Sequence, residues 1–229
     1  MRRPRDPNEL RKLPRALRAL LWRLPLELSQ LFARLTFRPF VRCCDTKLLK
    51  EYIPERGASL EDTTVTAGQR ELLVRALKET ENIKLPIVEI GAWHGATTAV
   101  LAEMTNRLIY AVDPYKDATG DEQDMQLMQE RIRGLTNVKH IRLSSGEAVK
   151  MLGHERFSLI FVDAIHDYLN TWFDFRAWGA LVAKEGLIAL HDVDDFPGAN
   201  LACRRILKRN GFVPWGYCPN IVVFRRSNA

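Results

Sequence analysis

The sequence predicts an α/β fold: a doubly wound, mostly parallel seven-stranded sheet with helices on both faces. Three observations lead to this prediction. From residue 85 onward, short apolar runs alternate with helical segments. The runs are continuously apolar, as strands buried on both faces are. The last two runs are separated by a turn too short for a helical crossover, so they predict an antiparallel hairpin at the C-terminus.

Seven strands can be assigned in order along this part of the chain. Their expected ranges are 86–90, 108–112, 138–143, 157–162, 186–190, 212–215 and 221–224. Helices are expected between them, beginning near Gly95, Asp121, Ser145 and Asp167, with a further helix over about 199–209. Because strands joined by helical crossovers run parallel, the first five strands predict a Rossmann-like sheet.

One more helix is expected before the first strand. Thr66 can cap its first turn, and Gln69 three residues later completes a capping-box pattern. Leu72, Leu73 and Leu77 would supply its buried face. This helix opens the predicted globular domain, which we place at residues 63–229.

Residues 1–62 are expected to form a basic helical arm followed by a linker. Residues 1–42 contain eleven Arg or Lys against three Asp or Glu, a surplus of eight, while the whole chain carries +6. The remaining residues hold 23 basic against 25 acidic side chains and are slightly acidic. The basic character therefore belongs to the arm and not to the domain.

Two short amphipathic helices are expected in the arm, each with a proline, Pro14 or Pro25, in its first turn. Apolar residues repeat at helical spacing behind each proline. The two stripes are Leu17, Leu20, Leu21 and Leu24, and then Leu28, Leu31, Phe32 and Leu35. Each stripe is expected to dock on a partner.

The first candidate partner of these stripes is the arm's own domain or the second subunit of a homodimer. A peripheral contact with a membrane surface is the alternative, because Trp22 and the arginines suit an anionic headgroup layer. Nucleic acid is the least favoured partner, since basic residues without aromatic stacking platforms are a weak signal.

Residues 43–62 are largely polar and are expected to be a linker with at most one helical turn.

The sequence also predicts the cellular compartment of the protein. No run of 18 apolar residues predicts a transmembrane helix, and charges and prolines interrupt every stretch that could serve a signal peptide. The four cysteines form no CxxC pair, which disfavours zinc and is typical of reduced thiols in a cytoplasmic protein.

Candidate site residues are those that follow the strands, since ligands of such a sheet bind beyond its carboxyl ends. After the first strand comes Glu89, followed by Gly91 and Gly95. Glycines allow a sharp turn and a close approach to a ligand. A loop for a pyrophosphate would prefer GxGxxG, whereas the spacing here is GxxxG. A tight turn that merely starts a helix is the plain alternative.

This loop resembles motif I of class I S-adenosylmethionine-dependent methyltransferases, E/DxGxxxGxS/T. In that family the loop wraps the amino-acid part of S-adenosylmethionine. The resemblance therefore implies cofactor binding by Glu89, Gly91, Trp93, His94, Gly95 and Thr97.

Two further segments fit the same resemblance. Asp113, at the end of the second strand, would hold the ribose hydroxyls, although its spacing suits NAD equally. Ser145 and Gly146 follow the third strand, and in the family the loop at this place borders the adenine ring. Capping of the next helix by Ser144 or Ser145 explains that segment equally well.

The fourth and fifth strands carry a more specific resemblance. The segment Asp163-Ala164-Ile165-His166-Asp167-Tyr168 resembles the DGxHxY segment of the methyltransferase-24 group. This group includes cephalosporin hydroxylase-like and macrocin O-methyltransferase-like proteins. The likeness continues through Asp174 and Trp178 to His191-Asp192 and covers roughly residues 88–193.

The chain departs from the pattern of this group at two positions. Ile165 stands where the group often has an acidic or amide residue, and Glu185 stands where it often has a second glycine. These departures leave the fold prediction unchanged but bear on the acceptor site.

The resemblance implies methyl transfer, which needs an aligned acceptor and, for a hydroxyl, removal of its proton. His166 is the candidate base, although a histidine that only bonds a neighbouring helix is the alternative. Asp163 and Asp192 end neighbouring strands and, as in catechol O-methyltransferase-like enzymes, would hold Mg²⁺. His191 or Asp195 would be a third ligand, and a purely capping Asp192 is the alternative.

We therefore predict an S-adenosylmethionine-dependent O-methyltransferase with Asp163 and His166 as catalytic residues and Asp163 also among the cofactor-binding residues. The expected acceptor is a small hydroxylated molecule, such as a sugar or a secondary metabolite. Methyltransferases that act on nucleic-acid bases usually carry [DNS]PP[YFW] where this chain has Asp163 to His166, which disfavours nucleic acid. A non-catalytic Rossmann-like module, recruited to a membrane or partner through its arm, is the alternative function. The GxxxG spacing disfavours an NAD(P)-dependent oxidoreductase.

Overall fold

The computed structural model describes the backbone of residues 15–116 and 120–227, and side chains within these ranges from residue 25 onward. One sheet has the strand order β1-β7-β8-β6-β5-β2-β3-β4. The strands are β1 (Glu51–Tyr52), β2 (Ile87–Ile90), β3 (Ile109–Val112), β4 (Val138–Ile141), β5 (Phe157–Val162), β6 (Val182–His191), β7 (Phe212–Cys218) and β8 (Ile221–Arg226). Only β8 runs antiparallel to its neighbours β6 and β7, which confirms the mostly parallel sheet and its C-terminal hairpin.

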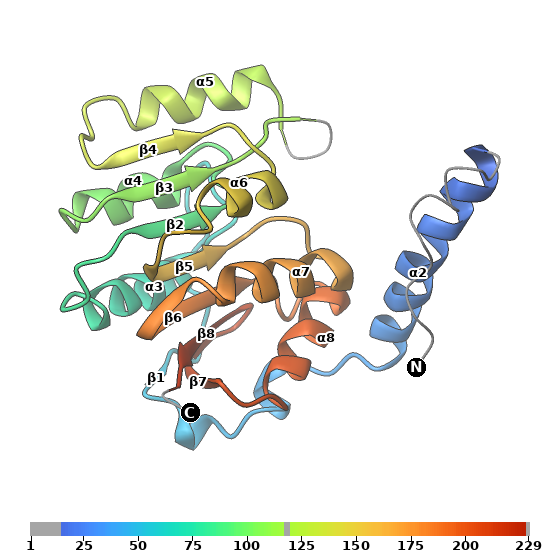
Figure 1. Ribbon diagram of the computed structural model, residues 1–229. Helices are drawn as coiled ribbons and strands as arrows, with labels where there is room; N and C mark the ends of the chain where they lie inside the picture. The colour runs from blue at the N-terminus through green and yellow to red at the C-terminus, as the bar shows by residue number, and fades with distance from the viewer. Residues whose placement is uncertain (1–14, 117–119, 228–229) are drawn as a thin grey trace.

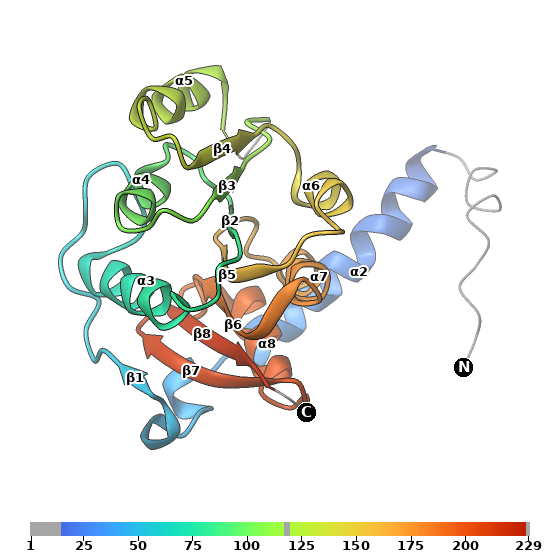
Figure 2. The ribbon, with the colours of Figure 1, turned by 60° about the vertical axis from the view of Figure 1, so that its left-hand side comes forward.

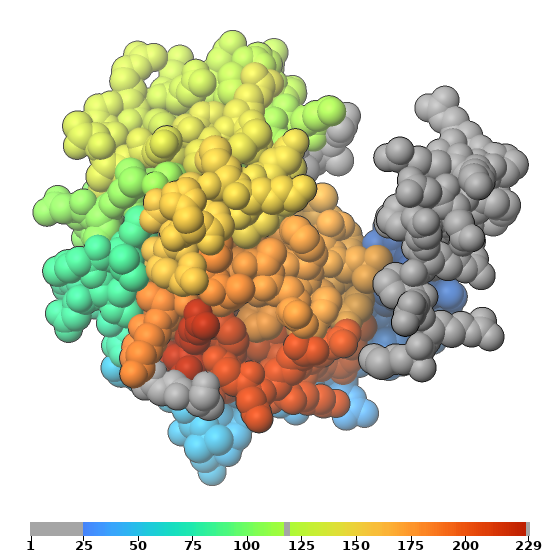
Figure 3. Space-filling model, in the orientation of Figure 1, coloured from blue at the N-terminus to red at the C-terminus, as the bar shows by residue number. Residues whose placement is uncertain are grey.

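Helices cover both faces of this sheet (Figures 1 and 2). They are α2 (Arg15–Leu35), α3 (Ala67–Glu79), α4 (Ala96–Glu103), α5 (Glu122–Arg131), α6 (Ser145–Met151), α7 (Tyr168–Gly179) and α8 (Pro197–Ile206), with 3-10 turns η1 (Phe40–Arg42) and η2 (Thr46–Leu48). Helices α3, α4 and α5 lie on one face, and α6, α7 and α8 lie on the other (Figure 2). Figure 3 shows α6 and α7 side by side over their face.

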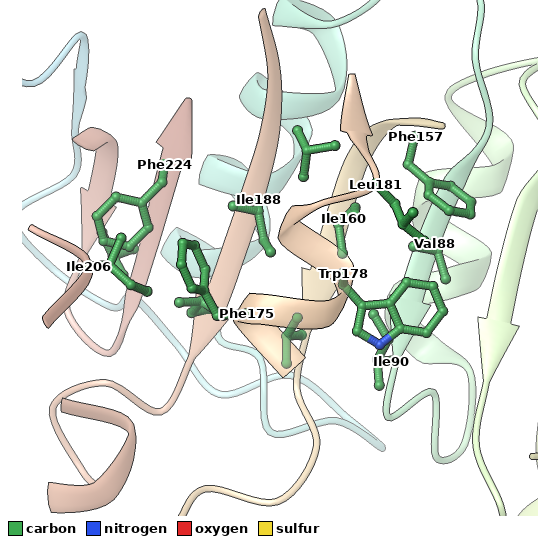
Figure 4. Close-up of a cluster of buried hydrophobic side chains, with 14 of the residues drawn as sticks. Val88, Ile90, Phe157, Ile160, Phe175, Trp178, Leu181, Ile188, Ile206 and Phe224 are labelled. Atoms are coloured by element: carbon green, nitrogen blue, oxygen red, sulfur yellow. The ribbon is translucent and has the colours of Figure 1, made fainter. Parts of the chain in front are cut away.

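The core has a large apolar cluster on each face of the sheet and a smaller one beside α5. Trp178 of α7 is fully buried and packs over Ile160 of β5 on one face (Figure 4). The neighbours of Ile160 in β5, Leu159 and Phe161, belong to the other cluster, with Leu72 of α3. Successive side chains of a strand point to opposite faces, and both faces are covered here. This is why β5 reads as a continuous apolar run.

The start of α3 agrees with the prediction from its capping box. The backbone N–H of Thr66 donates to Oε1 of Gln69 at 2.8 Å, and the Thr66 side chain caps the helix in return. The helix therefore begins where the sequence indicates.

One local departure from ideal geometry occurs inside β6. Glu185 has φ +61°, in the left-handed region, beside a register irregularity between β5 and β6. This is the position at which related sequences often have glycine, which adopts such a backbone without strain. The turn is thus kept although the glycine is not.

The sheet has eight strands where seven were expected, and the linker expected at 43–62 is wrong in this respect. Glu51–Tyr52 pairs in parallel with β7 at the edge of the sheet. Just before it, Phe40 is fully buried and its ring packs against Tyr217 and Phe224. A two-residue strand has no periodicity to read, so only the tertiary pairing reveals it.

The arm forms one helix, α2, where two were expected. Pro25 lies inside α2 and costs it one backbone hydrogen bond. The apolar spacing in the sequence continues across this proline from Leu24 to Leu28, so one amphipathic helix satisfies both stripes. Pro14 and the side chain of Trp22 lie outside what the structure describes.

The face by which α2 docks also differs from the expectation. The helix contacts α7 and α8, but fully buried Ala33 lies on the contact side. The expected docking stripe, Leu28, Leu31, Phe32 and Leu35, is exposed. Within the described residues, no helix combines the length and apolar composition that a bilayer crossing requires.

Candidate active site

A pocket of about 810 Å³ lies beyond the carboxyl ends of β2, β3, β5 and β6. Its volume falls within the range of small-molecule sites. It brings together most of the residues that the sequence singled out: Glu89, Gly91, Trp93, His94, Thr97, Asp113, Ser145, Gly146, Asp163, His166 and Asp192. Gly95, His191 and Asp195 do not line it.

The glycine loop after β2 is shaped by the fold itself. Gly91 has φ +90°, and a Cβ there would lie 1.9 Å from the carbonyl oxygen of Asp163, just after the neighbouring strand β5. Gly95 has φ +73° at the start of α4, and a Cβ there would lie 2.0 Å from Sδ of Met128. At Gly91 a larger residue would collide with backbone atoms, so glycine is required for packing there. At Gly95 the neighbour is a flexible side chain, and the positive φ is what favours glycine.

Asp113 joins the loops that follow β2 and β3. Its Oδ2 accepts from the backbone N–H of Trp93 at 3.0 Å, and its Oδ1 accepts from that of Tyr115 at 2.9 Å. Burial raises the pKa of Asp113, and these two hydrogen bonds oppose the rise. Each carboxylate oxygen keeps a second lone pair, so Asp113 can still accept hydroxyl protons from a ligand.

His94 is held beside this loop with one nitrogen left over. Its Nε2 lies 2.7 Å from Oδ1 of Asp124, and its ring stacks on Trp93 at 3.7 Å between centroids. Its Nδ1 is buried and has no hydrogen-bond partner among the described residues. Buried polar groups are normally paired, so an orphaned nitrogen in the wall of a pocket fits a site that takes a polar ligand.

Glu89 lies beneath the loop and is almost fully buried. The hydroxyl of Thr98 donates to its Oε2. Burial raises the pKa of Glu89 to about 8; the Thr98 hydrogen bond lowers it, and the charges of Asp163 and Asp113 add to the rise. At neutral pH, Glu89 therefore keeps its proton and can donate as well as accept.

The loop after β4 shows how its two serines divide their roles. Ser144 is the helix cap, since its side chain accepts from the backbone N–H of Glu147. The hydroxyl of Ser145 instead donates to Asp174 and accepts from Nε1 of Trp178 at 2.9 Å. Burial raises the pKa of Asp174 to about 6, against the lowering effect of the Ser145 hydrogen bond.

Two histidine–carboxylate pairs lie at the ends of β5 and β6. Nε2 of His166 lies 2.9 Å from Oδ2 of Asp192. Nδ1 of His191 lies 3.0 Å from Oδ1 of Asp163, and its Nε2 lies 3.1 Å from Oε1 of Gln69. Both partners of His191 accept hydrogen bonds there, so both ring nitrogens must donate and the ring is an imidazolium.

The pKa values of this cluster agree with that assignment. Burial lowers the pKa of His191, but the charges and hydrogen bonds of Asp163 and Asp192 outweigh it and raise that pKa to about 10. Burial likewise raises the pKa of Asp192, yet the hydrogen bonds from His166 and His191 carry it well below its usual range. Asn220 also donates to Oδ1 of Asp192 at 2.6 Å. Asp192 is therefore a carboxylate.

The same cluster is the candidate metal centre. Ligand-type atoms of Asp163, His191 and Asp192 lie within 4.8 Å of one another. His191 would have to give up its hydrogen bond to Asp163 to bind a cation. Asp195 is not part of the cluster, since it forms an exposed ion pair with Arg56, and its expected role as a ligand is wrong. The two carboxylates fit the preference of Mg²⁺ for oxygen ligands.

The charge of the pocket is one-sided. Its described lining residues include seven acidic side chains and neither Lys nor Arg: Asp62, Glu89, Asp113, Asp124, Asp163, Asp174 and Asp192. Even with Glu89 protonated, such a lining repels the pyrophosphate of a dinucleotide and attracts a cation. The spacing of Asp113 in the sequence, by contrast, suits NAD and S-adenosylmethionine equally.

The mouth of the pocket is more apolar than its floor. Trp93, Ile165 and Phe173 line it and are exposed. Phe196, also exposed, packs its ring against His166 with 4.7 Å between centroids. These residues can offer apolar contact to a ligand that reaches His166.

Sequence reasoning missed three residues of this site. Asp124 was not singled out, and the structure shows it in the cap of α5 with Asp121. Gln69 was noted only as the partner of Thr66 in the cap of α3. Asp174 was noted only for its likeness to related sequences. In each case the second contact comes from a distant part of the chain, which local spacing does not encode.

Comparison with known proteins agrees with this geometry. Residues 88–193 match a family model described as a methyltransferase domain. A comparison with curated proteins gave no match. The solved structures described next are only 13% or 17% identical to this chain, so their likeness shows the fold alone.

Three solved structures illustrate that fold. The O-methyltransferase NovP is 13% identical, with a TM-score of 0.61, over 72% of this chain and 82% of that one. CalS11, a TDP-rhamnose 3′-O-methyltransferase in calicheamicin biosynthesis, is 17% identical, with a TM-score of 0.55, over 69% and 80%. An O-methyltransferase from Bacillus cereus in complex with SAH is 17% identical, with a TM-score of 0.56, over 73% and 84%.

Proposed function

Because the chain carries a class I S-adenosylmethionine-dependent methyltransferase domain over residues 88–193, we propose that it methylates a hydroxyl group of a small molecule. The observation that carries the proposal is the pocket at the carboxyl edge of the sheet, lined by acidic side chains without a Lys or Arg among its described residues. S-adenosylmethionine is cationic at its sulfonium and ammonium groups, so its charge complements this lining.

The cofactor residues are proposed from their places in the pocket, and Gly95, which does not line it, from its place in the glycine loop. Asp113 would hold the ribose hydroxyls with its free lone pairs, and Ser145 and Gly146 would border the adenine. The residues of the glycine loop would hold the amino-acid part: Glu89, Gly91, Trp93, His94, Gly95 and Thr97. The unpaired Nδ1 of His94 supports this placement.

His166 is proposed as the base that takes the proton of the acceptor. Bound S-adenosylmethionine supplies a methyl group already activated on sulfur. Asp192 accepts a hydrogen bond from Nε2 of His166, so neutral His166 carries its proton there and keeps Nδ1 as a proton acceptor. The acceptor oxygen would lose its proton to Nδ1 as it forms its bond to the methyl carbon, and the bond from that carbon to sulfur would break with its electron pair left on sulfur. Asp163 would contribute charge beside the reacting atoms, held in place by His191.

A divalent cation would be held by Asp163 and Asp192. We assign the ligand role to these carboxylates because the bonded nitrogens of His191 are less available. Mg²⁺ there would lower the pKa of the acceptor hydroxyl. We expect methyl transfer to fall after treatment with EDTA and to return with added Mg²⁺. Activity that survives both EDTA and Asp192→Ala would remove the magnesium part of the proposal and leave the rest.

The proposed acceptor is a hydroxylated sugar or secondary metabolite with an apolar flank. Ile165 and Phe173 at the mouth of the pocket, and Phe196 against His166, support this flank. The O-methyltransferase neighbours NovP and CalS11 support oxygen as the methylated atom. A mass-spectrometric screen of hydroxylated small molecules with labelled S-adenosylmethionine would identify the acceptor. Transfer to any of them would exclude the alternative of a non-catalytic module.

Cofactor binding can be tested before the acceptor is known. Calorimetry with S-adenosylhomocysteine should show binding that Asp113→Ala weakens by about 1–3 kcal/mol, the range for hydrogen bonds to a charged group. Asp195→Ala is the matched control, because this aspartate pairs with Arg56 outside the pocket. Absence of binding by the intact protein would refute the cofactor assignment.

A further inference from the structure

Helix α2 presents an apolar face that no described part of the domain covers. The side chains of Leu28, Leu31, Phe32 and Leu35 are 57%, 54%, 56% and 77% exposed. At 100° per residue these four positions share one side of the helix. In the sequence, the same spacing continues towards the N-terminus at Leu17, Leu20, Leu21 and Leu24. Large exposed apolar patches of this kind mark interaction surfaces.

The opposite side of α2 is the one that touches the domain. Leu26, Ser29 and Gln30 are partly buried and Ala33 is fully buried. Their spacing of i, i+3, i+4 and i+7 places them on one side, turned about half a circle from the leucines. Docking on α7 and α8 therefore uses Leu26 together with small and polar residues and leaves the stripe of Leu28, Leu31, Phe32 and Leu35 free.

Hydrogen bonds hold the C-terminal end of α2 in this orientation. Arg204 of α8 donates to the backbone oxygen and the hydroxyl of Thr36. Asn200 of α8 donates to the backbone oxygen of Arg38 at 2.8 Å. The backbone N–H of Phe40 donates to Oδ1 of Asp194 at 2.7 Å. The chain just after α2 is thus pinned to the domain, while the N-terminal half of α2 extends away from the sheet (Figures 1 and 2).

The charge of the arm favours a lipid surface over a second copy of the chain as the partner of the apolar face. Residues 1–42 carry eleven basic against three acidic residues, and Arg34, Arg38 and Arg42 are exposed beside or just after the stripe. Two such arms would repel each other across a dimer interface. An anionic lipid surface would attract the arginines and bury the leucines and Phe32 at the same time.

We propose that α2 is an interfacial helix that docks the protein on an anionic lipid bilayer through Leu28, Leu31, Phe32 and Leu35. The helix would lie in the plane of the membrane, with its apolar side among the acyl chains and its arginines at the headgroups. Helices α7 and α8, on which it packs, both begin beside the pocket, at Tyr168 and Pro197. Docking would therefore hold the mouth of the pocket near the membrane surface.

Vesicle flotation of the full-length protein tests this proposal directly. The protein should float with phosphatidylcholine vesicles that contain phosphatidylglycerol and should not float with phosphatidylcholine alone. Binding should weaken as salt screens the arginines. The double substitution L31E/L35E should lower the bound fraction roughly tenfold or more, because it places charge on the apolar face.

The matched control carries the same change on a different exposed surface. Met104 and Leu127 are 47% and 44% exposed, next to and within helices on the α4 and α5 side of the sheet. M104E/L127E should float like the wild type. The thermal midpoint of L31E/L35E should match that of the wild type, since both leucines are exposed.

Three outcomes would overturn the proposal. The first is wild-type protein that does not float with anionic vesicles, and the second is equal flotation of L31E/L35E. The third is a wild-type dimer, seen by light scattering without lipid, that L31E/L35E converts to a monomer, because a second copy would then cover the stripe. Vesicle binding requires no methyl transfer, so this test is independent of the proposed function.

Discussion

Glu89 shows how a single side chain at this site departs from its ordinary chemistry. It sits inside β2, almost fully buried, with Asp113 and Asp163 close enough for their charges to act on it. A carboxyl in that position keeps its proton to a higher pH than in water. The acidic residue before the glycine loop is thus a neutral hydrogen-bonding group near pH 7, which its place in the sequence motif does not reveal.

Glu89 should make the stability of the protein depend on pH. Its pKa is about 8 in the folded protein and near 4.5 when it is exposed, so unfolding between these values releases a proton. The free energy of unfolding should therefore fall as the pH rises from about 4.5 to about 8, at up to about 1.4 kcal/mol per pH unit. Glu89→Gln, which can still accept from Thr98, should lose this slope in urea unfolding at pH 5, 6.5 and 8.

Asp174 has a pKa raised to about 6 and adds a similar slope at lower pH, so the wild type and Glu89→Gln must be compared at each pH. Asp174→Asn is the companion variant, whose difference in unfolding free energy from the wild type should change between about pH 4 and pH 6 and stay constant above that. Parallel profiles for the wild type and Glu89→Gln would contradict the assignment of a raised pKa to Glu89.

At the scale of elements, α3 links the edge of the fold to the candidate site. Gln69 accepts from the backbone of Thr66 within the helix cap and from His191 at the end of β6, and its Nε2 donates to the backbone oxygen of Pro219. One side chain therefore secures the start of a helix, the loop before β8 and the imidazolium beside Asp163. The capping pattern in the sequence accounts for only the first of these contacts.

Gln69→Leu should separate these roles when it is compared with Thr66→Ala. Loss of the Thr66 hydroxyl, which also donates to the backbone oxygen of Arg56, should cost about 1 kcal/mol of unfolding free energy. Gln69→Leu should cost more, about 2–4 kcal/mol, because it also leaves Nε2 of His191 buried without a partner. Urea unfolding measures both variants. Equal losses would show that the His191 contact contributes nothing to stability.

At the scale of the whole molecule, one part of the sheet carries the candidate site and the other part closes the fold. The parallel strands β2, β3, β5 and β6 bring the site residues to one edge, while β7, β8 and the short β1 close the other end. The chain before α3 contributes to that closure, since Phe40 packs between Tyr217 and Phe224. The arm thus ends where the core begins, close to Phe40.

Phe40→Ala should destabilise the protein by about 3–5 kcal/mol, as expected for a large buried aromatic ring. Deletion of residues 1–35 should leave the thermal midpoint within a few degrees of the wild type, because it retains Phe40 and the contacts of Thr36 and Arg38 with α8. Val41→Ala is the control, since Val41 is exposed next to Phe40. A small effect of Phe40→Ala would instead show that the chain before α3 contributes little to the core.

Local pattern was enough to predict the parallel strands, the crossover helices, the C-terminal hairpin and the gathering of Glu89, Asp113, Asp163 and His166 at one edge. A strand that is buried on both faces is apolar at consecutive residues, so it can be recognised from the sequence. The parallel topology then places the carboxyl ends of these strands at the same edge of the sheet. Contacts between distant segments could not be obtained in this way. The pairing of Glu51–Tyr52 with β7, the bond from Gln69 to His191 and the outward turn of the leucines on α2 each depend on which surface meets which. These contacts are set by the packing of the complete chain, because the sequence of a short segment does not specify which distant segment it will contact.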